Sequence, residues 1–369
     1  MAQEFNEREY ARQLVEAGVS PEQAVEVARR TAESRSRSRS PGGVQVGEAL
    51  ASLTASLADS QPKPSQPAKQ AKRKEPKALD ISPQQGKLLD VATEIATSSL
   101  EEARDNMAFT HAVLCQVGLP RSKVEGREFM RQSGAAWVNV QAGYLDEGQG
   151  PVPQPIPYGA LPRLALAHVS THAVRHKTRE IPIGDSAAQF LELMGMDHDG
   201  RRYTTLRKQM HALAACRLQL GFKGRTFNGQ AVEQFDAWLA NKDTGQRALW
   251  PGLMVLSEHF YNSLLDGAVP LDLRALHALK GSALALDVYA WLAQRLHRIE
   301  GRGVILRWTS LREQFAQEYT GPEADKNFKG AFLPQLKKVL AVYPQANVKR
   351  VRHGLLLLGS PPPIPPKLG

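Results

Sequence analysis

The chain has 369 residues, which exceeds a typical single domain and predicts two or three folded units with linkers between them. Its formal net charge of +10 favours a polyanion such as nucleic acid as the partner. Cys115 and Cys216 are the two cysteines, and their wide separation excludes a disulfide framework and a thiolate zinc site. The sequence shows neither a signal peptide nor an apolar run of about 20 residues, so we expect a cytoplasmic protein.

Two segments of different composition precede the main folded part. Residues 1–32 show helical spacing on both sides of AGVSPEQ, where Ser20 and Pro21 start a second helix, so they predict a small helical hairpin. Residues 33–83 contain SRSRSRS and QPKPSQPAKQAKRKEPK, which predict a disordered basic linker rich in Ser, Pro and Lys. We expect the hairpin either to dock on a partner or to fold only when it binds one. We expect the linker to touch DNA without sequence preference.

The remaining sequence predicts an α+β, mainly helical fold with two tandem winged-helix domains. A helical pattern from residue 84 through Cys115 and a β-hairpin come first. Helices at 161–177, 186–194 and 200–220 follow, with the strand REIPIG after the first of them. RLQLGFKG is the next strand and LWPGLMVLS its expected return. This order is that of a winged helix, a variant of the helix-turn-helix. It defines a first domain over 84–266, recurs over 267–360, and leaves a Pro-rich tail at 361–369.

The sequence GRRYTTLRKQMHALAACRLQL, residues 200–220, predicts a helix with two different faces. One side carries an apolar stripe that belongs to the core: Tyr203, Leu206, Met210, Leu213 and the stem of Arg217. The opposite side and the N-terminus carry the candidate DNA contacts: Arg201, Arg202, Thr204, Arg207, Lys208 and His211. A solvated face usually mixes Glu with Lys, and no acid occurs between residues 201 and 220. The pattern therefore favours a helix that lies in the major groove.

A second basic helix is predicted in the second domain. Its expected buried stripe consists of Phe328, Phe332, Leu336 and Leu340, and Pro334 predicts a kink or a split. Its candidate DNA contacts are Lys326, Lys329, Lys337 and Lys338. In the strand pair that follows, Lys349, Arg350 and Arg352 are placed for a wing that grips phosphate.

The motifs of common enzymes are missing from the sequence, which favours a binding protein without catalytic residues, metal or cofactor. There is no GxxxxGK[ST], no GxSxG and no His-x-His. His168, His172 and His176 recur every four residues but lack the Glu of HExxH, so we interpret them as core-edge or DNA-facing residues. Asp146 and Glu147 lie in a glycine-bearing turn, where surface carboxylates are expected.

Several long motifs between residues 125 and 362 resemble the plasmid-encoded RepA replication-initiator family. They are FMRQSGAAWVNVQAGYL, PQPIPYGALPRL, REIPIGDSAAQFLELMG, LRKQMHALAACRL, VPLDLRALHALKGSALALDVYAWLAQRL and AVYPQANVKRVRHGLLLLGSPPP. The resemblance implies a plasmid initiator that binds repeated origin sites, opens nearby A·T-rich DNA and helps to load the host helicase. The segment 5–32 separately resembles the N-terminus of the TrfA initiator, which implies docking to a partner.

Three other interpretations remain open. The same domains could serve a sequence-specific transcriptional repressor that acts on its own gene. A nickase or primase would be an enzyme, and a protein that coats nucleic acid would bind without sequence preference. For an initiator or a repressor, two basic helices in tandem domains, acting as a monomer or a homodimer, predict a repeat site of about 20 bp.

Overall fold

The computed structural model describes Val25, Arg29 and residues 82–184, 186–194, 196, 200–236 and 252–365. The predicted hairpin at 1–32 and the linker at 33–83 lie almost entirely outside these residues. The chain divides into two compact units, Met1–Ser98 and Ser99–Gly369. In the described residues, no helix combines the length and apolar character that a membrane span requires.

The helix predicted from residue 84 through Cys115 is in fact interrupted. In the first unit, α4 (Pro83–Thr97) begins at a capping box in which Ser82 and Gln85 bond reciprocally. Ser98 is extended and ends α4, and Ser99 caps a new helix with Glu102. The second unit then begins with α5 (Leu100–Asp105), strand β1 (Met107–His111) and the short helix α6 (Ala112–Gln116).

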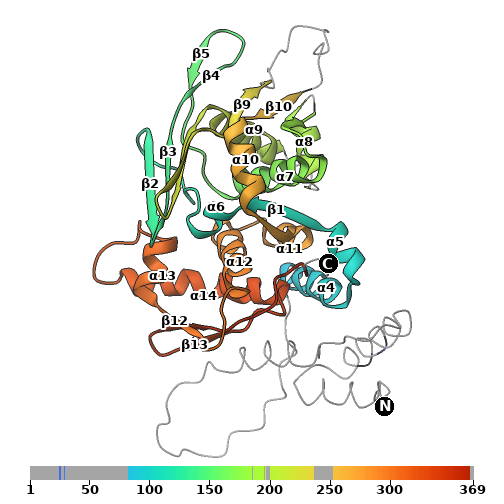
Figure 1. Ribbon diagram of the computed structural model, residues 1–369, viewed down its shortest axis with the longest axis vertical. Coiled ribbons are helices and arrows are strands. Elements are labelled where there is room, and N and C mark those ends of the chain that lie inside the picture. Colours follow the sequence, from blue (N-terminus) through green and yellow to red (C-terminus); the bar gives the residue numbers. More distant parts are fainter. Residues whose placement is uncertain are drawn as a thin grey trace, which may run out of the picture. The chain divides into compact units, whose positions relative to one another are not determined.

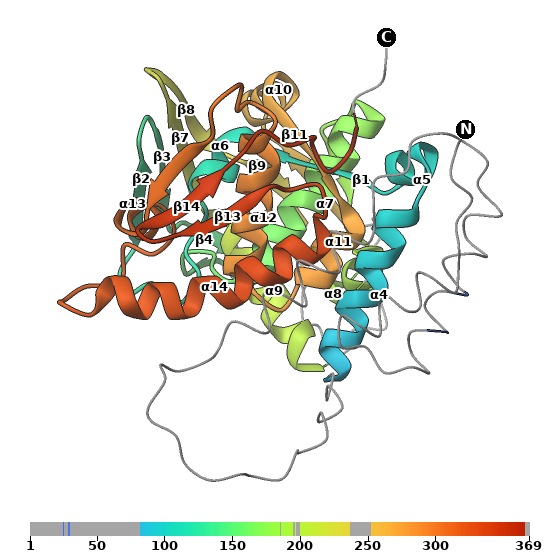
Figure 2. The same ribbon diagram turned by 90° about the horizontal axis from the view of Figure 1, so that it is seen from below.

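A four-stranded antiparallel sheet forms one side of the second unit (Figures 1 and 2). Its strand order is β2 (Glu128–Ser133), β3 (Ala136–Gln141), β7 (Arg217–Phe222) and β8 (Arg225–Gln230). Alternate residues of β3 face the core, and Ala136, Val138 and Val140 are fully buried. A small hairpin, β4 (Tyr144–Asp146) and β5 (Pro151–Pro153), follows β3.

A three-stranded sheet and three helices follow that hairpin. The elements are α7 (Ala160–His176), β6 (Glu180–Pro182), α8 (Ala187–Leu193), α9 (Gly200–Ala215), β9 (Val232–Phe235) and β10 (Leu253–Leu256). The sheet has the order β6-β10-β9. RLQLGFKG and LWPGLMVLS, expected to pair with each other, do not: β7 pairs with β3 and β8, whereas β10 pairs with β6 and β9.

The C-terminal part has a second three-stranded sheet, of order β12-β14-β13. The elements of this part of the chain, in order, are α10 (Glu258–Gly267), β11 (Ala268–Asp272), α11 (Leu273–Leu279), α12 (Ala283–Leu296), β12 (Val304–Arg307), α13 (Trp308–Phe315), α14 (Ala324–Val342), β13 (Val348–Val351) and β14 (Gly354–Leu357). Helix α13 begins at Trp308, with Arg307 as its N-cap. Both helices and strands build the unit, as expected for the α+β class.

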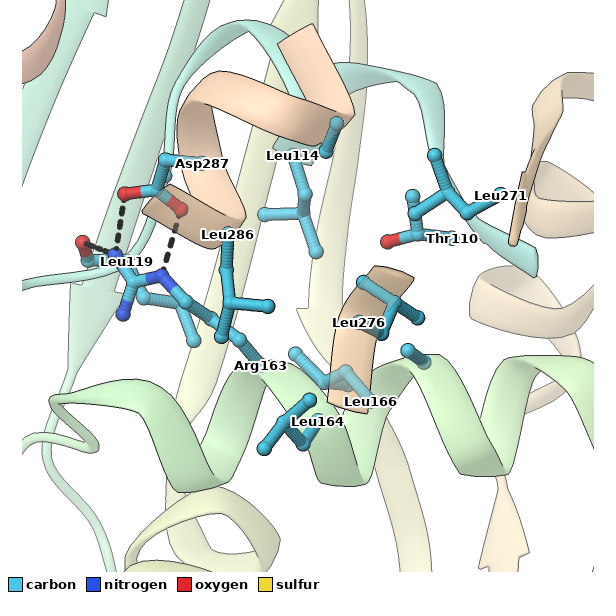
Figure 3. Close-up of a pocket in the computed structure, with 13 residues that line it drawn as sticks. Thr110, Leu114, Leu119, Arg163, Leu164, Leu166, Leu271, Leu276, Leu286 and Asp287 are labelled. Carbon is cyan, nitrogen blue, oxygen red and sulfur yellow. Dashed lines mark hydrogen bonds and ion pairs between the residues drawn. The ribbon is translucent and has the colours of Figure 1, made fainter. Parts of the chain in front are cut away.

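Strand pairing and a buried ion pair join the segments on either side of residue 267, the predicted domain boundary. Strand β1 pairs antiparallel with β11. Arg163 on α7 contacts Asp287 on α12, with Nε 2.6 Å from Oδ1 and Nη2 2.8 Å from Oδ2 (Figure 3). The pair borders a cavity of about 40 Å³ with a mainly leucine lining. The boundary itself stays a prediction.

Candidate nucleic-acid interface

Helix α9 is exposed along its first half and buried along its second. Leu206, Met210 and Leu213 are at most 1% exposed, which confirms the central part of the predicted stripe. Every residue from Gln209 to Ala215 is buried, because α7, α8, β9 and β4 all contact the helix. Only the stretch that ends at Lys208 therefore presents side chains to solvent.

Several predicted contacts lie on this exposed stretch. Thr204 and Lys208 are exposed, Arg202 is half-buried, and the Arg207 side chain is 23% exposed. Nothing is described for the side chain of Arg201.

Two of the residues assigned to the apolar stripe lie elsewhere. Tyr203 is 37% exposed and belongs to the surface. Arg217 is exposed in β7, because α9 ends two residues earlier, at Ala215. The predicted stripe is therefore shorter than its periodicity indicated, because both of its end residues are exposed.

The expectation that His211 contacts DNA is wrong, because its side chain is enclosed. It is 2% exposed, its ring packs edge-on to Phe235, and its Nδ1 is 3.3 Å from Glu147 Oε1. Burial lowers the pKa of His211, and the adjacent Glu147 carboxylate only partly opposes this effect. A neutral, buried imidazole supports the helix and does not reach a base.

The β4–β5 hairpin supplies the acid that α9 itself lacks. Glu147 at its tip accepts a hydrogen bond from Gln154 Nε2 at 2.7 Å, and its Oε2 is 3.9 Å from Arg207 Nη2. The Gln154 bond is the main cause that lowers the pKa of Glu147. Asp146 instead closes the turn, since its Oδ1 accepts the N–H groups of Gly148 and Gly150. The sequence did not place Glu147 at α9, because a contact across about 60 positions leaves no local pattern.

The second basic helix, α14, packs against α11, α12 and α13 (Figure 2). Phe328, Phe332 and Leu336 are buried as predicted, while Leu340 is half-buried. The helix is continuous through Pro334, so it is not split there. Pro334 and Gly330 are both exposed, which lets water bond the carbonyl that a proline leaves without an intrahelical donor.

The predicted lysines of α14 lie near both of its ends. Lys326 Nζ is 2.6 Å from Glu323 Oε2, and Lys329 Nζ lies 5.3 Å from the centre of the Trp308 ring. Lys337 and Lys338 are exposed near the C-terminal end. The β13–β14 hairpin adds three exposed cations, Lys349 and Arg350 on β13 and Arg352 in the turn.

Of the three histidines of α7, His168 and His172 are half-buried, and His176 is exposed. His168 packs edge-on against Phe190 at 5.3 Å, and burial lowers its pKa to about 4. The rings of His172 and His176 lie 4.3 Å apart. Within the described ranges no group of His, Cys, Asp and Glu is arranged to hold a metal ion.

Comparison with known proteins gives a family match over part of the chain. Residues 156–309 match the family model described as "Plasmid encoded RepA protein". This match confirms the resemblance found in the sequence for that segment. No curated protein matches the chain.

Two solved structures of RctB domains 2 and 3 are also similar. One, a selenomethionine derivative, has a TM-score of 0.43 and 12% identity, and the match covers 67% of this chain and 98% of that chain. The other, RctB-155-483, has a TM-score of 0.39 and 12% identity, with coverage of 65% and 85%.

Proposed function

The chain carries the plasmid-encoded RepA family region over residues 156–309, and from this premise we propose that it is a plasmid replication initiator. It binds repeated duplex sites at the plasmid origin, promotes opening of the adjacent DNA and helps to recruit the host helicase machinery. Its place of action is the bacterial cytoplasm, on plasmid DNA. It needs no catalytic residue, metal or cofactor for these steps.

The proposal rests on one observation: the first half of α9 is exposed and basic, and its second half is buried. The exposed half presents Arg202, Thr204, Arg207 and Lys208, whereas the second half is held in the core. Recognition helices of helix-turn-helix proteins contact base edges with their N-terminal residues. A helix whose exposed N-terminal half is basic, on a rigid buried base, suits that role.

Strand order supports winged-helix domains on both sides of residue 267. In each part a helix, a strand and two helices precede two more strands, and the last strand lies between the other two: β6-β10-β9 and β12-β14-β13. This order is the one expected of a winged helix, and it supports the proposal. Helix α9 takes the recognition position in the first, with the β7–β8 hairpin inserted after it, and α14 takes it in the second.

The second domain contributes mainly phosphate contacts. The middle of the exposed surface of α14 is formed by Gly330 and Pro334, neither of which can form a side-chain hydrogen bond to a base. The lysines lie on either side of it: Lys326, Lys329, Lys337 and Lys338. Lys349, Arg350 and Arg352 grip the backbone from the β13–β14 hairpin. Such contacts position a protein on the duplex and do not select a sequence.

Binding is tested by footprinting the purified chain on the DNA that flanks its own gene. We expect protection of repeats of about 20 bp, and weaker binding by Arg207→Ala and Lys208→Ala without a loss of folding. Lys338→Ala should weaken binding to all sequences alike and lower the salt dependence by about one unit. Equal affinity for the repeats and random duplex at physiological salt would refute site-specific binding.

Initiation is tested separately from binding. A plasmid that carries only this gene and its repeats should be maintained, and single-strand-specific reagents should modify the A·T-rich DNA beside the bound repeats. Repression of the gene's own promoter without plasmid maintenance would instead identify an autorepressor. Nicks or primers formed on origin DNA with Mg²⁺ would overturn the non-enzymatic proposal, and capture of the replicative helicase would support recruitment.

A further inference from the structure

We propose that Glu147 is a positioning residue that fixes Arg207 for sequence readout by α9. The inference rests on the proposed function, in which Arg207 reaches a base edge. It adds a residue outside α9 that sets specificity without touching DNA.

The β4–β5 hairpin is held against α9 at two points. Gly143, just before β4, lies so close to the C-terminal end of α9 that a Cβ atom there would be 1.9 Å from the Ala215 carbonyl oxygen. At the other point, Glu147 contacts His211 and Arg207, which lie one and two turns before that end. The hairpin therefore follows the helix from its buried end toward its exposed half.

The carboxylate of Glu147 has a fixed orientation. Gln154, itself 6% exposed, donates to Oε1 at 2.7 Å, and the backbone N–H of Gln154 donates to the Gly143 carbonyl at 2.9 Å. His211 Nδ1 approaches the same oxygen at 3.3 Å. Oxygen Oε2 consequently points toward Arg207.

The distance between Glu147 and Arg207 allows the carboxylate to orient the guanidinium without forming a hydrogen bond to it. At 3.9 Å the contact between Oε2 and Nη2 is an electrostatic attraction and is longer than a hydrogen bond. It restrains the guanidinium without using the N–H groups that would pair with guanine O6 and N7. An arginine fork that is already oriented loses less entropy when it forms such a bidentate contact.

The same negative charge lowers affinity for every duplex, because it lies beside a surface that meets phosphates. Glu147 thus weakens general binding and strengthens discrimination at one base pair. Loss of its charge should move these two quantities in opposite directions, which a purely structural role would not do.

The test uses the full chain with Glu147→Gln, which keeps the shape of the side chain and removes its charge. Binding is measured to a duplex that the wild-type protein selects from a random pool, and to each single-base-pair variant of it. We expect discrimination at one base pair to fall about tenfold, with tighter binding to non-selected duplex. The affected base pair should be the one whose preference disappears in Arg207→Ala.

A double-variant cycle shows whether Glu147 acts through Arg207. In the Arg207→Ala background, Glu147→Gln should change discrimination at every base pair of the selected duplex less than twofold. Glu125→Gln, an exposed carboxylate between α6 and β2, removes the same charge and should leave the pattern unchanged. Gln154→Leu releases the Glu147 carboxylate and should reproduce part of the loss.

Two results would overturn the inference: full discrimination by Glu147→Gln, or a loss of discrimination at a base pair that Arg207→Ala leaves unaffected. In both cases the wild-type protein still selects a sequence, so the proposed function stands. Absence of any selected sequence for the wild-type protein would instead refute the proposed function.

Discussion

The buried ion pair of Arg163 and Asp287 joins the segments on either side of residue 267, and its contribution to the free energy of unfolding can be measured. Their side chains are 9% and 8% exposed, so neither charge is well hydrated. At an effective dielectric constant near 20, two unit charges about 4 Å apart attract by about 4 kcal/mol. Removal of one partner from a buried pair costs about 3–5 kcal/mol. In Asp287→Leu, Arg163 keeps its hydrogen bonds to the carbonyls of Pro120 and Gly159. We therefore expect this substitution to lower the free energy of unfolding by about 3 kcal/mol, at the low end of that range.

Urea unfolding followed by tryptophan fluorescence measures this loss. Arg163→Met should be at least as damaging, because it leaves a buried carboxylate and several carbonyls without their donor. The double variant Arg163→Met/Asp287→Leu should be more stable than Arg163→Met alone, since it no longer buries an unpaired charge. A loss below about 1 kcal/mol for Asp287→Leu, or strict additivity of the two substitutions, would refute the reasoning.

Three further predictions concern the core of the same unit. Leu206→Asp places a charge at a fully buried position and should destabilise the fold by more than about 3 kcal/mol, whereas wild-type-like unfolding would remove Leu206 from the core. Gly143→Ala should cost about 1–3 kcal/mol and release the β4–β5 hairpin, seen as faster amide exchange there; unchanged exchange would contradict the close approach to α9. Burial lowers the pKa values of His111 and His168 to about 4, so the unfolded chain binds more protons between pH 6.5 and 4. The free energy of unfolding should therefore fall by about 2 kcal/mol per histidine from pH 7 to 5, and a flat profile would show that these imidazoles are not desolvated.

Local patterns predicted the elements of this fold better than their partners. The spacing of Leu206, Met210 and Leu213 gave both the helix and its buried side, because burial on one face imposes a helical period. The same spacing misplaced His211, since it cannot show that further elements cover the second half of α9 on all sides. A stripe read from one helix contains no information on what packs against the opposite face.

Long-range pairing was the part that the sequence could not provide. RLQLGFKG was correctly expected to be a strand, but its partners include β3, which lies about 80 residues earlier. Both β3 and β10 are rich in apolar residues, so strand character alone does not choose between them. Glu147 was missed for the same reason: a carboxylate in a glycine-rich turn has the same local pattern whether it faces solvent or a distant helix.

Under the proposed function, the burial of α9 from Gln209 onward also limits which residues could be changed to give this protein a new target sequence. Substitutions in that half would disturb α7, α8 and the hairpin before they changed any contact with DNA. Among the α9 side chains that the structure describes, variation that alters the proposed recognition and preserves the fold is confined to residues 202–208, less than two turns of helix. A combinatorial library restricted to Arg202, Thr204, Arg207 and Lys208, with Glu147 varied as their support, is therefore the smallest set from which proteins with altered origin preference should be recovered.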